Sequence, residues 1–133
     1  MAYQSSKPPS TRLVYDGAAL RIEFYVASNG VVPAEEWLDR LSLGSQQKFA
    51  ALFARMGETG RIWNERKFKH LTETDQIFEF KVEADRVLCF FFVKRRLILT
   101  HGFRKSGDKT PKREIDRAEA YKKDFEGRVQ DER

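Results

Sequence analysis

The sequence predicts an α+β domain in which a largely antiparallel sheet packs on a helical hairpin. Three apolar runs of strand length follow one another with short charged links, over residues 77–82, 86–93 and 97–101. Two amphipathic helical stripes precede these runs and a third follows them. The order is therefore β-α-α-β-β-β-α, a two-layer arrangement of one domain. We expect a mobile tail over residues 1–19, the domain over 20–126 and a frayed end over 127–133.

The first strand and the helical hairpin come from the N-terminal half. Residues 20–26 alternate apolar and polar side chains and predict the first strand. Pro33 suits the first turn of a helix, and Gly44 and Ser45 are expected to end that helix and cap the next. Each helix carries one apolar stripe, formed by Ala34, Trp37, Leu38 and Leu41 and then by Phe49, Leu52, Phe53 and Met56. The two tryptophans, Trp37 and Trp63, are expected in core or edge packing.

The three apolar runs predict a meander. Short links can join only antiparallel neighbours, since parallel strands need a long crossover. The middle run is apolar at every position from 87 to 93, so we expect it to be central and covered on both faces. Residues 67–71 could add a short extended piece before the meander. The register stays open, because Val82 could pair with Val87 or with Arg86.

A last helix is expected after the meander. Thr110 is expected to cap it and Pro111 to open it. Its apolar stripe is narrow, so it is expected to lie across an edge or across the second face of the sheet. That second face carries Phe90 or Phe91 beside basic residues and is the expected working surface.

Composition favours a polyanion as the partner. The chain carries a net charge of +5, whereas residues 86–113 hold nine Lys or Arg against one acid, a local charge of +8. The positive charge is thus concentrated on the meander and the loop that leaves it. No apolar run is long enough to span a membrane and the N-terminus does not resemble a signal peptide. Together with the single, apolar-flanked Cys89, this favours the cytoplasm.

Cations beside a ring and a carboxylate match what RNA binding or cleavage requires. If Val82 pairs with Val87, one sheet face holds Glu79, Lys81, Arg86, Leu88 and Phe90. Attack of a 2′-hydroxyl on phosphorus needs a base, cations for the oxyanion and a proton for the leaving oxygen. The sequence has no metal-ligand spacing, Gly-rich phosphate loop or nucleophile elbow, so neither metal nor cofactor is expected. The alternatives are a plain ion pair at Glu79 and a structural His101.

Four motifs resemble the RelE/ParE superfamily of type II toxins, in its phage-derived HigB-like branch. The most specific is Leu99-Thr100-His101-Gly102-Phe103-Arg104-Lys105 followed by Lys109-Thr110-Pro111. The helix opening over residues 30–38 and the strand motifs over 78–81 and 86–90 are similar to the family's patterns. The resemblance covers residues 20–126. Cys89 stands where an aromatic is common, and Ser106 replaces a lysine.

The resemblance implies a function, and it places Lys81, Arg86, Arg104 and Lys105 at matching site positions, to which the charge pattern adds the other candidates. Members of this superfamily are mostly ribonucleases that cut messenger RNA on the ribosome and are neutralised by a co-expressed antitoxin, here expected to be a helix-turn-helix protein. A ParE-like minority inhibits DNA gyrase, so the alternative is a non-catalytic interaction protein, either a gyrase inhibitor or a phage accessory factor. The expected catalytic set is Lys81, Arg86, Arg104, Glu79 and His101. The expected RNA-binding set is Lys105, Lys109, Phe90, Lys67 and Lys69.

Overall fold

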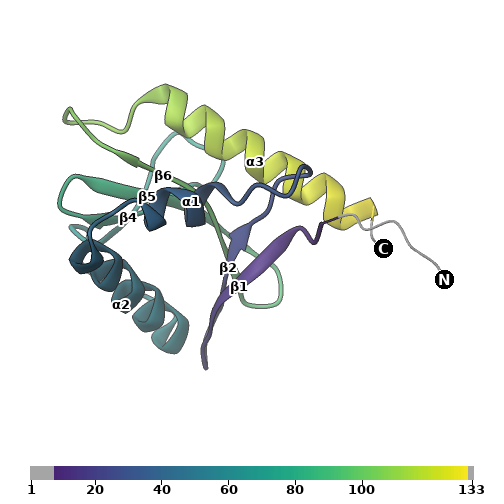
Figure 1. Cartoon of the computed structure of the whole chain (residues 1–133), viewed down its shortest axis with the longest axis horizontal. Coiled ribbons are helices and arrows are strands. Elements are labelled where there is room, and N and C mark those ends of the chain that lie inside the picture. The colour runs from purple at the N-terminus through teal and green to yellow at the C-terminus, as the bar shows by residue number, and fades with distance from the viewer. Residues whose placement is uncertain (1–7, 132–133) are drawn as a thin grey trace.

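The fold has six strands and three helices, seen in a computed structural model that describes residues 8–131 (Figure 1). The helices are α1 (Pro33–Asp39), α2 (Leu43–Thr59) and α3 (Lys112–Asp131). The strands are β1 (Thr11–Asp16), β2 (Arg21–Tyr25), β3 (Phe68–His70), β4 (Phe78–Val82), β5 (Asp85–Phe92) and β6 (Arg96–Arg104). No helix in this part of the chain is both long and apolar enough to cross a membrane.

All six strands form one sheet in the order β1-β2-β6-β5-β4-β3. The neighbours pair antiparallel except for β2 and β6, which run parallel. The expected meander is confirmed, because β4, β5 and β6 are consecutive and β5 lies between the other two. The parallel pair is possible because both helices α1 and α2 lie in the crossover between β2 and the meander. The α+β class and the largely antiparallel sheet are therefore confirmed.

The ordered fold extends beyond residues 20–126 at both ends. Residues 11–16, expected in the tail, form β1 and pair with β2. Gly17 makes this hairpin fit, since a Cβ there would lie 2.2 Å from the backbone of Gly57 in α2. At the other end α3 continues to Asp131, past the expected frayed start at 127. Residues 1–7 and 132–133 lie outside the described part.

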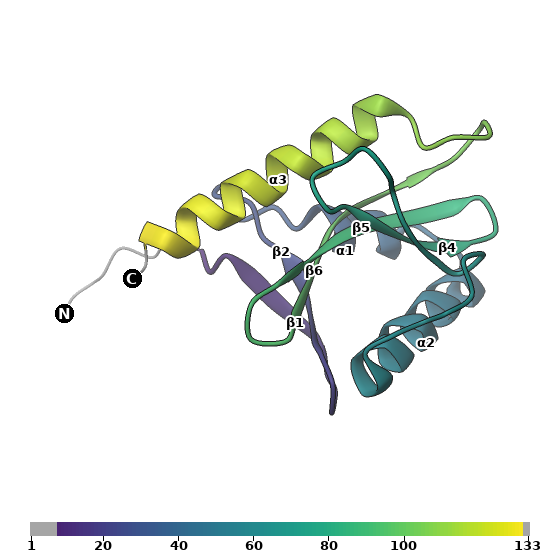
Figure 2. The same ribbon diagram turned by 180° about the vertical axis from the view of Figure 1, so that it is seen from behind.

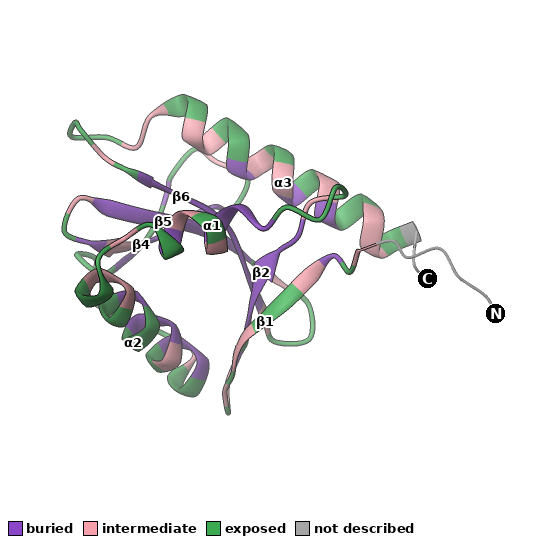
Figure 3. Cartoon of the chain, in the orientation of Figure 1, coloured by how far each residue is buried: buried purple, intermediate pink, exposed green. Residues whose placement is uncertain are grey.

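Helices cover both faces of the sheet and create two cores (Figures 1 and 2). Helices α1 and α2 pack on one face, as the predicted helical hairpin requires, over side chains such as Ile22, Val87 and Leu99. Helix α3 lies across the other face, where Phe125 contacts Phe90 with ring centroids 5.6 Å apart. Figure 3 shows the sheet as mostly buried between these layers. Contrary to expectation, most of the second face is core and is closed to a ligand.

The start of α2 differs from the expected one. Ser42 is its N-cap, and the Ser42 hydroxyl accepts a hydrogen bond from the Ser45 backbone N–H at 3.2 Å. Gly44 therefore lies in the first turn of α2 and does not end α1, which stops at Asp39. Two serines three residues apart can both serve as caps in a sequence argument. Ser42, which directly precedes the first residue of α2, has the extended backbone that an N-cap needs.

Candidate functional site

The pairing of β4 with β5 brings the central charged residues onto one face. Val82 lies opposite Asp85 and Lys81 opposite Arg86, so neither register considered from the sequence is correct. The turn between the strands holds only Glu83 and Ala84. Residues that lie opposite each other on paired strands point to the same face. The observed partner of Val82, Asp85, lies two residues before Val87, and a shift by an even number of residues leaves every side chain on its predicted face. Glu79, Lys81 and Arg86 therefore share a face, as that register predicted.

Glu79 is the buried anion of this group. Its side chain is 3 % exposed and accepts a hydrogen bond from the Thr110 hydroxyl at 2.8 Å. Glu79 also lies 3.9 Å from the ammonium of Lys81 and 3.8 Å from Nε of Arg86. A buried carboxylate is stable only when it is paired and hydrogen-bonded. These three partners satisfy that condition and tie β4, β5 and the loop after β6 to one point.

Lys81 lies on the wall of a cleft at the end of the sheet near the start of α3. The cleft has a volume of about 320 Å³, at the lower end of the range for ligand sites. Its cations come from three segments, with Lys69 on β3, Lys81 on β4, and Lys105 and Lys109 on the exit loop, by which we mean residues 105–111. Acidic Glu73, Glu79 and Asp108 also border it.

The cleft changes the acidity of Lys81. Desolvation by burial lowers the pKa of its ammonium, and the neighbouring cations Lys69, Arg86 and Lys105 lower it further. Glu79 acts in the opposite direction, since its negative charge favours the protonated form. The net effect is that Lys81 loses its proton more easily than an exposed lysine does. In its neutral form, a lysine surrounded by fixed cations can accept a proton beside a phosphate.

Arg86 belongs to the turn more than to the cleft. Its Nη1 donates to the backbone carbonyls of Glu83 and Asp85. Its Nε is buried and has no hydrogen-bond acceptor among the described residues. Arg86 does not line the cleft. Its geometry is that of a side chain that holds the β4–β5 turn and neutralises Glu79.

Phe90 and His101, both candidates from the sequence, lie in the core. Phe90 is fully buried beneath α3 and presents no ring to a base. The His101 ring is also buried, with Nε2 3.0 Å from the Glu114 carboxylate and Nδ1 3.2 Å from the Thr100 hydroxyl. Burial lowers the pKa of His101 to about 4, against the opposing effect of Glu114. A neutral, enclosed imidazole cannot reach a substrate in this arrangement.

Arg104 and Lys67 also lie outside the cleft, although neither is buried in the core. Arg104 alternates with Phe103 along β6, so its side chain points away from the α3 face and pairs with Asp85 at 3.2 Å. Lys67 precedes β3 and borders a separate hollow beside α2. Five of the ten candidates thus meet at the cleft: Glu79, Lys81, Lys69, Lys105 and Lys109.

Thr110 is a cleft residue that the sequence reasoning assigned elsewhere. It was expected to cap α3, and its hydroxyl instead donates to Glu79. The Lys-Thr-Pro motif of the exit loop could have identified it, because the motif places a hydroxyl next to a lysine outside the apolar stripe of the following helix. Among the described residues, no cluster of three or more His, Cys, Asp or Glu side chains could hold a metal ion.

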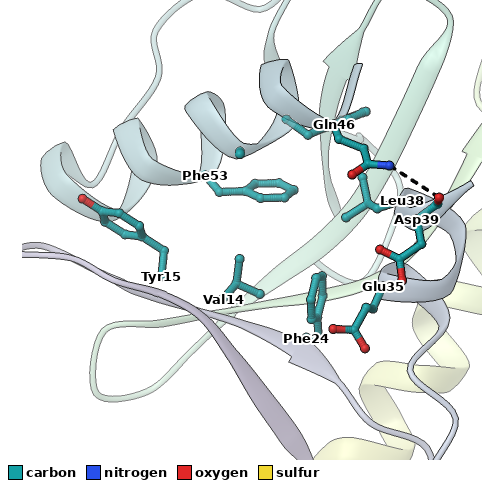
Figure 4. Close-up of a pocket in the computed structure, with 10 residues that line it drawn as sticks. Val14, Tyr15, Phe24, Glu35, Leu38, Asp39, Gln46 and Phe53 are labelled. Carbon is teal, nitrogen blue, oxygen red and sulfur yellow. Dashed lines mark hydrogen bonds between the residues drawn. The ribbon is translucent and has the colours of Figure 1, made fainter. Parts of the chain in front are cut away.

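Another hollow lies between β1, β2 and helices α1 and α2 (Figure 4). Val14, Phe24 and Phe53 point into it, and Glu35 and Asp39 stand on its rim. Glu35 is paired with Arg12, and no lysine or arginine among the described residues lines this hollow, so its apolar floor offers no cation to a phosphate. The cleft around Lys81 is therefore the better site for a phosphate-bearing ligand.

Comparison with known families gives a match over residues 36–123 to the model of "Phage derived protein Gp49-like (DUF891)". That span is more than half of the 133 residues. The chain belongs to the Gp49-like family. This is a phage-derived, RelE/toxin-like family. No curated protein matches the chain.

The Gp49-like match includes the elements that build the cleft. It runs from α1 through all of β3, β4, β5 and β6 into α3. Lys69, Glu79, Lys81 and the exit loop all lie within it. The hairpin of β1 and β2 lies outside it.

Proposed function

We propose that this Gp49-like protein is the toxin of a type II toxin–antitoxin system and acts as a metal-independent endoribonuclease on ribosome-bound messenger RNA in the cytoplasm. The observation that carries the proposal is the cleft, where four lysines from β3, β4 and the exit loop surround one buried carboxylate. Fixed cations are suited to phosphate oxygens, and the four lysines outnumber the three acids that border the cleft, so the surplus positive charge favours an anion. The family membership supports the toxin class.

The chemistry assigns a role to each cleft residue. Lys81 accepts the proton of a 2′-hydroxyl, whose oxygen attacks the adjacent phosphorus while the bond from phosphorus to the 5′-oxygen breaks. The proton needed by the 5′-oxygen comes from a protonated lysine of the cleft. Lys69, Lys105 and Lys109 stabilise the charge that develops on the phosphate oxygens. Glu79 holds Lys81 and the exit loop in place through Thr110.

Replacing Lys81 tests this function. Lys81→Ala should reduce cleavage of ribosome-bound message by roughly 10²–10³-fold and abolish growth arrest on induction. Lys123→Ala is the matched control, because Lys123 is an exposed lysine of α3 away from the cleft. A wild-type protein that leaves the message intact, or a Lys81→Ala variant as active as wild type, contradicts the proposal.

The proposal includes an antitoxin partner, expected to be a helix-turn-helix protein. A cleft with a surplus of cations favours a partner that supplies acidic side chains. Co-expression with the product of the adjacent open reading frame should yield a co-purifying complex and remove the growth arrest. If the two proteins elute separately and the toxic effect persists, this partner is wrong.

One observation favours a non-catalytic alternative, a gyrase inhibitor or a phage accessory factor of the same fold. Arg104 and His101, two of the five expected catalytic residues, lie outside the cleft, and Arg86 turns towards the β4–β5 turn. In a supercoiling assay, inhibition of gyrase that survives Lys81→Ala would support the alternative. Absence of any effect on supercoiling would leave the ribonuclease proposal as the one to pursue.

A further inference from the structure

Trp63 is exposed although the sequence reasoning placed it in the core or at an edge. Its residue surface is 77 % exposed, the largest exposed fraction among the large apolar side chains described. The guanidinium of Arg61 lies over its ring, 5.3 Å from the centroid. Arg55 on α2 borders the same hollow. An indole ring flanked by two arginines is the combination that binds an unstacked base and its phosphate.

Next to Trp63 lies a groove that is almost uniformly basic. It runs between α2, the segment before β3 and the end of β4, and its charged residues are Lys48, Arg55, Arg66, Lys67, Lys81 and Glu83. The single acid, Glu83, pairs with Lys48 at 3.0 Å. In the part of the chain that the structure describes, neither Arg55 nor Arg66 nor Lys67 forms an ion pair. Their charges are therefore available to an anion from outside.

Shared residues join this groove to its two neighbours. Arg55 borders both the groove and the hollow of Trp63, and Lys81 borders both the groove and the cleft. The connection is made at Lys81, whose backbone N–H donates to the carbonyl of Lys67 at 2.9 Å, so the Lys67 of the groove lies beside the Lys81 of the cleft. A basic track thus runs from Trp63 along α2 to Lys81, and we call it the Trp63 track.

We propose that a single strand of RNA lies along the Trp63 track, with one unpaired base stacked on Trp63 and its phosphates on Arg55, Arg66 and Lys67, and enters the cleft at Lys81. The choice of RNA rests on the proposed function. A single strand is required because base pairing hides the faces of the bases that an indole contacts. The track therefore assigns substrate binding to a surface on the α2 side of the sheet, outside the cleft.

The test is equilibrium binding of a fluorescent single-stranded 2′-O-methyl RNA of about ten nucleotides, a length within the site sizes of single-strand binders. This RNA lacks the attacking 2′-hydroxyl, so cleavage cannot distort the measurement. Trp63→Ala should weaken binding by about 5- to 150-fold, the range that loss of one base–aromatic stack produces. Trp63→Phe should retain most of the affinity. Leu43→Ala, at an exposed apolar residue that begins α2, is the control and should bind like wild type.

Two further measurements separate the track from general charge attraction. Removing the phosphate contacts with Arg66→Ala and Lys67→Ala should reduce the salt dependence of binding by about one unit of slope or less per contact. RNA should also quench the fluorescence of Trp63, whereas a duplex of the same sequence should not.

The outcomes distinguish the track from the ribonuclease proposal. If wild-type protein binds the strand through Trp63 but cleaves nothing, the track stands and the ribonuclease proposal fails. If Trp63→Ala binds the single strand as tightly as wild type, the track is wrong even when cleavage is intact, and the exposed tryptophan then fits a protein partner. Equal binding of duplex and single strand by wild type also overturns it.

Discussion

Lys81 and Arg86 lie opposite each other on β4 and β5, but their side chains make different contacts. Both approach Glu79 at almost the same distance. Lys81 faces the cleft, whereas the guanidinium of Arg86 donates to carbonyls of the turn. The sequence reasoning treated them as an equivalent catalytic pair. At the scale of single residues, the direction of a long side chain decides function, and strand alternation determines only its face.

Arg86→Ala should therefore destabilise the protein. The change leaves Glu79 buried with one cation fewer and removes the donor to the carbonyls of Glu83 and Asp85. Breaking a buried pair of this kind costs roughly 3 kcal/mol. Urea unfolding measures the effect, with Lys81→Ala as the comparison, for which we expect a loss of only about 1 kcal/mol. If Arg86→Ala unfolds like wild type, Arg86 is not a structural residue.

His101 should make stability depend on pH. Its pKa in the fold is about 4, below the ordinary value of 6.5, so the unfolded chain binds more protons between these values. Stability should fall as the pH drops from about 6.5 to about 4, by roughly 2–3 kcal/mol, and should be independent of His101 above that window. Glu114 and Arg117 of α3 modulate the pKa of His101 in opposite directions, and Tyr121 of α3 packs edge-on against the ring.

Urea midpoints between pH 4 and pH 8 check this dependence. His101→Gln should flatten the curve in the acid range, because glutamine does not titrate. His70→Gln is the control at an exposed histidine and should leave the curve unchanged. A wild-type curve no steeper than that of His101→Gln would show that the ring is accessible to protons in the fold.

At the scale of elements, α1 is positioned by a glycine of β6. Gly102 faces the ring of Trp37, and a Cβ at Gly102 would lie 2.1 Å from the Trp37 ring. The His-Gly-Phe part of the exit motif thus has a packing reason. His101 and Phe103 point to the α3 face, and Gly102 between them leaves room for α1 on the other.

Gly102→Ala should push α1 off the sheet. Added volume in a tight contact costs about 1–3 kcal/mol, so thermal unfolding should occur at a clearly lower temperature. Gly107→Ala is the matched control, because a Cβ at this exit-loop glycine meets no atom within 4 Å. Equal melting temperatures for the two variants would mean that α1 can shift without loss of packing.

At the scale of the whole molecule, charge is divided between two sides. The cleft and the Trp63 track are basic, whereas the hollow beside β1 has an acidic rim. The net charge of +5 therefore understates the field that a polyanion meets on the basic side. The acidic hollow shares helix α2 with the Trp63 track, but it shares none of its described lining residues with the track or with the cleft, so the acidic and basic surfaces are separate.

RNA binding should consequently depend steeply on salt. If about four or five phosphates contact the protein, raising the salt from about 50 to about 200 mM should weaken binding roughly 50- to 130-fold. Fluorescence anisotropy with a labelled single strand at several salt concentrations measures the slope. A flat response would exclude an electrostatic interface of this size.

The sequence by itself determined the elements that depend on neighbours along the chain. Apolar stripes located α1, α2 and α3, and the short links located the antiparallel meander, because helix and turn geometry follow from residues a few positions apart. The observed register differs from the Val82–Val87 register by two residues, so Glu79, Lys81 and Arg86 lie on one face as that register predicts. Concentration of lysines around the exit loop was also visible, since composition needs no fold.

Tertiary structure alone decided which of these residues a ligand can reach. Helix α3 buries Phe90 and His101, and no local pattern states which sheet face a distant helix will cover. The hairpin of β1 and β2 completes the sheet through a parallel contact with β6, a pairing between segments far apart in the chain. The same long-range packing leaves Trp63 exposed beside Arg55 and joins α2 to Lys81. Burial is a property of contacts across the whole chain, and the residues of a site can be named from sequence only when those contacts are local.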